Sequence, residues 1–176
     1  MDIMEWKEKD KQEAFRKYGR IINKIDFEMP DGEVKDFYIK QEGPAVAVLA
    51  ITDDNRIILA KQFRPGPQKV FYELPGGYLD ENEKPEVSAA RELLEETGYE
   101  GSVELVGTVY DDAYSTMKRY CFVVKDCKKV TEQSLDDGEH VEIAYKSQEE
   151  FRDLLRSGEM TDVEVGYLCL DHLKML

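Results

Sequence analysis

The stretch Gly77–Tyr99, GYLDENEKPEVSAARELLEETGY, decides the fold of the chain around it. Pro85 suits the first turn of a helix, because its missing N–H would have no partner there in any case. Most of the residues that follow are strong helix formers. Gly98 suits the left-handed position that often ends a helix. The stretch therefore predicts a helix over 85–97 with a loop on either side.

Three carboxylates stand where this helix ends. Glu92, Glu95 and Glu96 are spaced i, i+3 and i+4, so they share one helix face. Like charges at these spacings repel by roughly 0.2–0.5 kcal/mol per pair, and each also opposes the helix dipole by about 0.3–1 kcal/mol. A divalent cation would remove both penalties, and oxygen ligands favour Mg²⁺, Mn²⁺ or Ca²⁺ over zinc. With 38 Asp and Glu in 176 residues, a solvated acidic face is the alternative for an isolated pair.

The whole stretch resembles the Nudix box, G-x5-E-x7-R-E-U-x-E-E-x-G-U, where U is a bulky apolar or aromatic residue, and it matches at every fixed position. The resemblance implies a Nudix hydrolase, an enzyme that cleaves nucleoside diphosphates linked to another moiety and uses Mg²⁺ or Mn²⁺. It implies that Glu92 and Glu96 ligate the metal and that Glu95 assists. The backbone carbonyl of Gly76 is implied as a further ligand.

The resemblance also implies catalytic roles. Within the box, Arg91 is expected to orient the glutamates and Glu83 to support the site. In several relatives a Glu in the loop before the last strand activates water, and Glu139 is the first candidate for that base here. Glu83 and Glu95 are rival candidates, and a solvated loop acid is the alternative for Glu139. His140 is interpreted as a surface residue, because metal–hydroxide chemistry does not require it.

Two segments outside the box resemble the ADP-ribose pyrophosphatases of this family. KQFR, ending at Arg64, is similar to their R-Q-x-R pattern, and ELPGG, starting at Glu73, is similar to their E-L-P-A-G pattern. Arg64 at a strand end suits bidentate phosphate binding, whereas Lys61 acts more as a point charge. Glu73 suits a hydrogen bond from a base or ribose. The predicted reaction is hydrolysis of ADP-ribose or a related nucleoside diphosphate sugar to AMP and a sugar phosphate.

The segment after the box departs from that subfamily. Many ADP-ribose enzymes have Ser-Pro-Gly followed by a Glu there, whereas this chain has DAYSTMKR over 112–119. Tyr114, Lys118 and Arg119 are expected either to contact a different sugar or nucleoside or to be ordinary loop residues, with Arg119 kept as a candidate substrate-binding residue. Two other functions stay open: hydrolysis of oxidised nucleoside triphosphates or dinucleoside polyphosphates, and nucleotide sensing by an inactive Nudix domain.

Composition excludes some classes of protein. The formal net charge of −14 argues against broad binding to nucleic acid, which needs clustered Lys and Arg. Nothing resembles a signal peptide, and no apolar run approaches the roughly 18 residues of a membrane span. The three cysteines are too scattered for a disulfide framework, and Cys121 and Cys169 are expected to be buried thiols. A cytoplasmic protein without nucleic-acid or membrane partners is predicted.

The order of the expected elements predicts the fold class. The charged segment 2–18 is interpreted as a marginal surface helix. Alternating apolar residues over 25–29 and 34–40, on either side of a Pro-Asp-Gly turn, predict a β-hairpin. The apolar run AVAVLAI over 45–51 predicts a strand covered on both faces. Further strands are expected over 56–63, 102–110, 120–125 and 141–144, with helices from Ser147 to Gly158 and from Thr161 towards the C-terminus.

These elements predict an α/β fold with a mixed sheet, and the Nudix resemblance implies the same α/β/α sandwich over 42–176. Residues 1–41, with their helix and hairpin, resemble the extra N-terminal β-domain of ADP-ribose pyrophosphatases. In those relatives the segment often builds a dimer. A small antiparallel extension and a homodimer are therefore predicted.

Overall fold

The structure is a computed structural model that describes residues 4–136 and 138–176. The chain divides into two compact units. The smaller unit comprises Met1–Gly43 and Tyr110–Lys118, and the larger comprises Pro44–Val109 and Arg119–Leu176. Within the described residues, no helix has both the length and the apolar content needed to cross a membrane.

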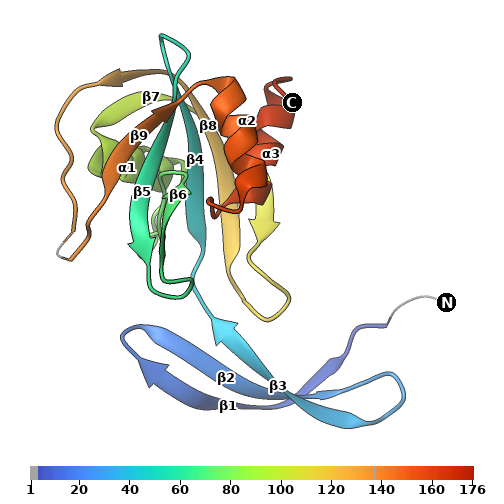
Figure 1. Cartoon of the computed structure of the whole chain (residues 1–176). Helices are drawn as coiled ribbons and strands as arrows, with labels where there is room; N and C mark the ends of the chain where they lie inside the picture. Colours follow the sequence, from blue (N-terminus) through green and yellow to red (C-terminus); the bar gives the residue numbers. More distant parts are fainter. Residues whose placement is uncertain (1–3, 137) are drawn as a thin grey trace. The chain divides into compact units, whose positions relative to one another are not determined.

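The larger unit is built on a mixed sheet, six-stranded in the described part of the chain (Figure 1). The strand order is β6-β5-β4-β8-β7, and β9 pairs with β5. β4 and β8 are parallel, whereas β5 is antiparallel to β4, β6 and β9. The strands are β4 (Ala45–Thr52), β5 (Ile57–Arg64), β6 (Lys69–Glu73), β7 (Tyr99–Tyr110), β8 (Lys118–Lys129) and β9 (Glu142–Lys146).

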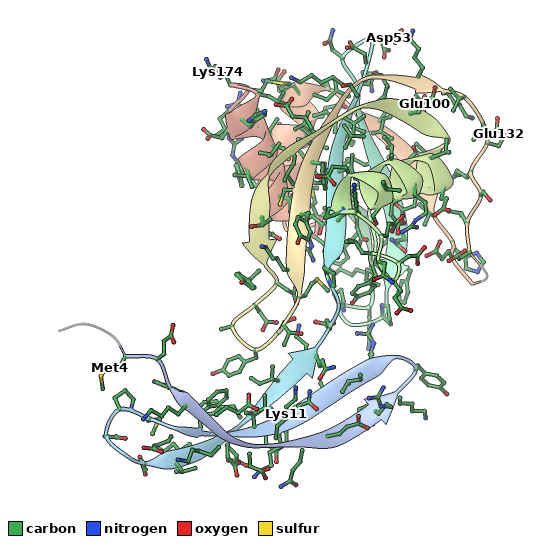
Figure 2. All side chains as sticks on the ribbon, turned by 180° about the vertical axis from the view of Figure 1, so that it is seen from behind. Met4, Lys11, Asp53, Glu100, Glu132 and Lys174 are labelled. Carbon is green, nitrogen blue, oxygen red and sulfur yellow. The ribbon has the colours of Figure 1, made fainter. Side chains whose placement is uncertain are left out.

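Helices cover both faces of this sheet, which confirms the predicted α/β/α sandwich. Figure 1 views the sheet from the side of α2 (Gln148–Ser157) and α3 (Val163–His172), and Figure 2 from the side of α1 (Pro85–Thr97). Successive residues of β4 alternate between the two layers, as the period of a strand requires. Val46, Val48 and Ala50 pack with α1, whereas Ala47, Leu49 and Ile51 pack with α2 and α3.

The helix ends follow the signals in the sequence. The box helix begins at Pro85 and ends before Gly98, whose φ is 75° and whose N–H donates to Leu94 O at 2.8 Å. At α2, Ser147 and Glu150 form a reciprocal capping box: Glu150 N–H donates to Ser147 Oγ at 3.2 Å, and Ser147 N–H donates to Glu150 Oε2 at 2.7 Å. The helices predicted over 85–97 and from Ser147 to Gly158 are therefore confirmed.

The smaller unit corrects one prediction. Its strands are β1 (Lys7–Lys17), β2 (Arg20–Glu28) and β3 (Val34–Gln41), which form a three-stranded antiparallel sheet. The surface helix expected over 2–18 is therefore wrong for its described part. Tyr18 and Gly19 both have positive φ, as in the tight turns that favour hairpins. This turn starts the pairing of β1 with β2, and that pairing overrides the helix propensity of the Lys and Glu residues.

Residues 112–118 of the segment that departs from the ADP-ribose subfamily belong to this smaller unit. Lys40 N–H donates to Tyr114 O at 2.7 Å, and Thr116 N–H donates to Lys40 O at 3.0 Å. The ammonium of Lys40 lies 2.7 Å from both Asp111 and Asp112. Backbone pairing and ion pairs thus join this loop to the end of β3.

Candidate active site

Arg91 on α1 is the centre of the polar contacts of the box. Its Nε and Nη2 donate to the two carboxylate oxygens of Glu83 at 3.0 and 2.9 Å. Its Nη1 donates to Glu92 Oε1 at 2.9 Å and to Glu95 Oε2 at 3.0 Å. A bidentate pair fixes orientation as well as charge. One guanidinium therefore holds three carboxylates of the box in place.

The contact with Arg91 decides the state of Glu83. Hydrogen bonds from Arg91 lower the pKa of Glu83 to about 2, against the opposing effect of burial. A base is most effective when its pKa lies near the working pH. Glu83 is thus a poor proton acceptor near neutrality, which favours a supporting role for it over the rival role of general base.

Two glycines let the acids of the helix approach the preceding loop. A Cβ on Gly77 would overlap the carboxylate of Glu92, so a side chain at this position would displace that acid. A Cβ on Gly76 would overlap the carbonyl oxygen of Val46 in β4. Gly76 N–H donates to Glu96 Oε2 at 3.1 Å. The two glycines thus allow backbone and carboxylates to share a narrow space.

Glu96 is the most deeply buried acid of the box, with 6% of the residue exposed. Burial raises its pKa to about 8; the Gly76 N–H opposes this shift, and the negative charges of Glu92 and Glu139 add to it. Burial also raises the pKa of Glu92, whereas Arg91 lowers it. Both ionised forms are therefore disfavoured as long as no cation lies beside them.

The predicted ligands and the predicted base line one cavity of about 290 Å³. Its lining includes Glu92, Glu95, Glu96, Gly76 and Glu139. The structure thus gathers these residues as the sequence predicted, although Glu139 lies 43 positions after Glu96 in the chain. Their roles stay predictions.

The loop that carries Glu139 is tied to the end of the box helix. Ser134 N–H donates to Glu95 O at 2.8 Å, and Gln133 Nε2 donates to Glu96 O at 2.6 Å. Gln133 Nε2 also lies 3.2 Å from Val141 O, so one side chain joins the end of the box helix to the far end of the loop. Sequence reasoning missed Gln133, because nothing in a lone glutamine shows which carbonyls it will reach.

Of the predicted substrate residues, Arg64 and Glu73 lie together. Arg64 Nε donates to Glu73 Oε1 at 2.7 Å, and its Nη2 donates to Glu73 Oε2. Gln62 Nε2 donates to Glu73 Oε2 at 3.0 Å. Glu73 is buried, whereas the Arg64 side chain stays 46% exposed. Glu73 therefore orients a guanidinium whose outer side faces solvent. β6, which carries Glu73, was not predicted from the sequence.

The other two predicted substrate residues lie elsewhere. Lys61 Nζ is 3.4 Å from Glu142 Oε2, and Lys61 lines a second cavity beside the first. Arg119 Nη1 lies 3.0 Å from Asp162 Oδ1 and 2.8 Å from Glu164 Oε1, at the start of α3. Arg119 lines neither of these cavities, and neither do Arg64 and Glu73. His140 is exposed, as expected, and the buried state predicted for Cys121 and Cys169 is confirmed.

The fold and the box define a class of protein: the chain belongs to the Nudix family. The family model described as NUDIX domain matches residues 41–165. The predictions of Nudix membership, of an α/β sandwich and of a Nudix hydrolase enzyme are confirmed with it.

Within this family, the chain is similar to particular proteins. It is 32% identical to the ADP-ribose pyrophosphatase of Bacillus subtilis (strain 168) over 172 residues, which cover 95% of this chain and 92% of the relative. It is 33% identical to the methanol dehydrogenase activator of Bacillus methanolicus, over 86% of this chain and 87% of the relative. A solved ADP compounds hydrolase superposes with a TM-score of 0.84 over 99% of this chain and 97% of its own. At 20% identity, that likeness shows the fold alone.

Proposed function

We propose that this enzyme hydrolyses the pyrophosphate bond of ADP-ribose or a related nucleoside diphosphate sugar, giving AMP and a sugar phosphate. The observation that carries the proposal is that Glu92, Glu96 and Glu139 line the same cavity. The similarity to an ADP-ribose pyrophosphatase over most of both chains supports this choice of substrate. The pairing of Arg64 with Glu73 supports it too, because an oriented guanidinium suits bidentate phosphate binding.

The donors of the cavity fit Mg²⁺ or Mn²⁺. They are carboxylate and carbonyl oxygens, and Glu96 is buried beside like charges that a cation would offset. Within residues 4–136 and 138–176, no three His, Cys, Asp or Glu side chains are gathered as a metal site. In this structure Arg91 donates hydrogen bonds to the carboxylates of Glu92 and Glu95. Glu92, Glu96 and the Gly76 carbonyl are the proposed ligands. A cation bound there would neutralise negative charge on the phosphate and lower the pKa of the water bound to it.

The chain's own residues then have separate tasks. Glu139 takes a proton from the water that attacks phosphorus, and Glu95 is the rival for this task. Arg91 orients Glu92 and Glu95 through its Nη1. Asp136 holds the candidate base, since its carbonyl accepts from Glu139 N–H at 3.0 Å and its N–H donates to Glu139 Oε2 at 3.3 Å.

We extend the proposal to a homodimer, in which a second copy covers the small sheet. Trp6, Phe27 and Phe37 form an aromatic group there, with ring centroids 5.3–6.3 Å apart. Trp6 is 45% exposed, and every residue of β1 is exposed. Small sheets need a packed face for stability, and exposed apolar patches mark interaction sites. The cytoplasmic location stays a prediction.

A regulatory role is the second candidate, favoured by the similarity to a methanol dehydrogenase activator. A chain of this kind would bind a nucleotide and a partner enzyme. The complete box and its gathered acids favour hydrolysis as the first candidate.

A substrate panel tests these alternatives. Release of nucleoside monophosphate, pyrophosphate or inorganic phosphate is measured for ADP-ribose, other nucleoside diphosphate sugars, nucleoside triphosphates and dinucleoside polyphosphates, with Mg²⁺ and with Mn²⁺. The highest kcat/KM is expected for a nucleoside diphosphate sugar. A preference for triphosphates or dinucleoside polyphosphates would overturn the substrate assignment. Tight binding of ADP-ribose without products would point to the regulatory role.

A further inference from the structure

A second cavity adjoins the carboxylate cavity and shares Glu139 with it. It measures about 670 Å³ and lies between the end of β5 and the loop that carries Glu139. Glu139 lines both cavities, so the two spaces adjoin at this residue. We call this second space the β5 groove. Its volume falls within the range of small-molecule sites.

Two large apolar side chains of the strands are exposed in the β5 groove. Phe63 and Val70 are directly opposite each other in the β5–β6 register, and they are 57% and 54% exposed. Leu135 and Val141 add apolar surface from the loop. The polar residues of the lining are Lys61, Gln62, Glu139, His140 and Glu142. Phe63 and Val70 are adjacent, and contiguous exposed apolar surface of this kind occurs in ligand-binding grooves.

The aromatic ring in the lining distinguishes the two ends of the proposed substrate. A ribose presents hydroxyl groups and needs many hydrogen-bond partners. A nucleobase presents a flat face that stacks on an aromatic ring and polar edges that need only a few partners. The ring of Phe63, beside Val70 and Val141, suits the flat face.

We propose that the β5 groove binds the nucleobase of the substrate, with Phe63 as the stacking surface. This inference rests on the proposed function, since it places the base relative to a pyrophosphate at the carboxylate cavity. Stacking on an aromatic ring is tolerant of base identity. The enzyme is therefore expected to show similar KM values for nucleoside diphosphate sugars that contain adenine, guanine or cytosine.

Binding of a fluorescent product analogue tests the groove directly. Etheno-AMP in Mg²⁺ buffer is titrated with wild-type protein, with Phe63→Ala and with Phe63→Trp. Phe63→Ala is expected to weaken binding about tenfold, within the range that base–aromatic stacking supplies, and Phe63→Trp is expected to retain it. Leu105→Ala is the matched control, because Leu105 is another exposed apolar residue, on β7 at the opposite end of the strand order.

Kinetics separate this inference from the proposed function. Phe63→Ala is expected to raise the KM for ADP-ribose about tenfold with kcat nearly unchanged, because a stacking contact made equally in ground and transition states affects binding. An unchanged KM in a variant that still cleaves ADP-ribose would overturn the groove and leave the function standing. A variant that changes only the oligomeric state, with analogue affinity intact, would assign Phe63 to an interface between copies. A wild type that binds the analogue through Phe63 and cleaves no sugar diphosphate would refute the function alone.

Discussion

Arg119 Nη1 lies 3.0 Å from Asp162 Oδ1, and both side chains are largely buried, with 16% and 13% exposed. Asp162 precedes α3 with a φ of 32°, and its Oδ2 accepts from Leu74 N–H at 3.3 Å. The ion pair thus links β8, the start of α3 and the segment that leads into the box. Arg119, predicted as a substrate residue, is engaged in this structural contact.

Replacing Arg119 by Met is therefore expected to reduce stability more than substrate binding. It leaves Asp162 largely buried without its guanidinium partner, at a cost of about 1–3 kcal/mol. Urea unfolding gives the stability, and steady-state kinetics give KM. The double variant Arg119→Met with Asp162→Asn should recover part of the loss, because no buried charge remains. A raised KM with unchanged stability would restore the substrate role.

Neutralising Glu96 is expected to abolish turnover while keeping the fold. Glu96→Gln preserves the shape of the side chain and removes the charge that burial disfavours. We expect kcat to fall by orders of magnitude and Mg²⁺ uptake, measured by calorimetry, to weaken. Stability without metal should stay equal or rise. Glu86→Gln, an exposed acid of the same helix, is the control. Turnover at the wild-type rate in Glu96→Gln would refute the metal assignment.

The box helix was predictable because its signals are local. Pro85, a run of helix formers and Gly98 are contiguous in the sequence, and the helix spans Pro85–Thr97 as predicted. The segment 7–17 has similar helix formers, but its structure depends on pairing with a strand further along the chain. β6 was missed because it has only five residues and gains its structure from pairing with β5. Strand pairing depends on tertiary context that propensity does not contain.

In the candidate site, too, the residues in local motifs were predictable, whereas the contacts that depend on the fold were not. Motif spacing predicted the box acids and Arg91. A loop position predicted Glu139, and the fold brings it to the same cavity. The ion pairs of Arg64 and Arg119 were not predictable, because a guanidinium in a sequence gives no sign of which carboxylate it will reach. Arg64 reaches Glu73 nine positions away, and Arg119 reaches Asp162 in a different element.

Gln133 offers a test of how the Glu139 loop is positioned. Its side chain donates to Glu96 O at 2.6 Å and to Val141 O at 3.2 Å. Gln133→Ala is expected to lower kcat between about 10- and 100-fold, the scale for a displaced catalytic group, with KM little changed. Faster hydrogen exchange over the loop should accompany it.

Gln148→Ala is the matched control for this loop. Gln148 Nε2 also donates a hydrogen bond to a backbone carbonyl, that of Met175, at 2.7 Å in another part of the larger unit. It should affect stability alone. Equal losses of kcat in the two variants would mean that Gln133 acts only through global stability.

Stability at low pH should reveal the pair of Glu83 and Arg91. Hydrogen bonds from Arg91 lower the pKa of Glu83 from its usual value near 4.5 to about 2. A carboxyl whose folded pKa is depressed contributes stability that is present above the unfolded pKa and is lost as the pH falls through the folded pKa. The stability difference between wild type and Glu83→Gln should therefore be constant above about pH 5 and shrink between 4.5 and 2. A difference that does not vary with pH would contradict the pair's electrostatic contribution.

Gly77 gives the sharpest geometric test of the box. A Cβ there would overlap the carboxylate of Glu92, and the neighbouring backbone cannot move freely because Gly77 O accepts from Val46 N–H at 2.8 Å in β4. Gly77→Ala should displace Glu92, so that kcat and Mg²⁺ affinity fall together while the sheet stays folded. Gly66→Ala is the control, since a Cβ there meets nothing within 4 Å. Wild-type kcat and Mg²⁺ affinity in Gly77→Ala would contradict the assignment of Glu92 as a metal ligand at the position it has here.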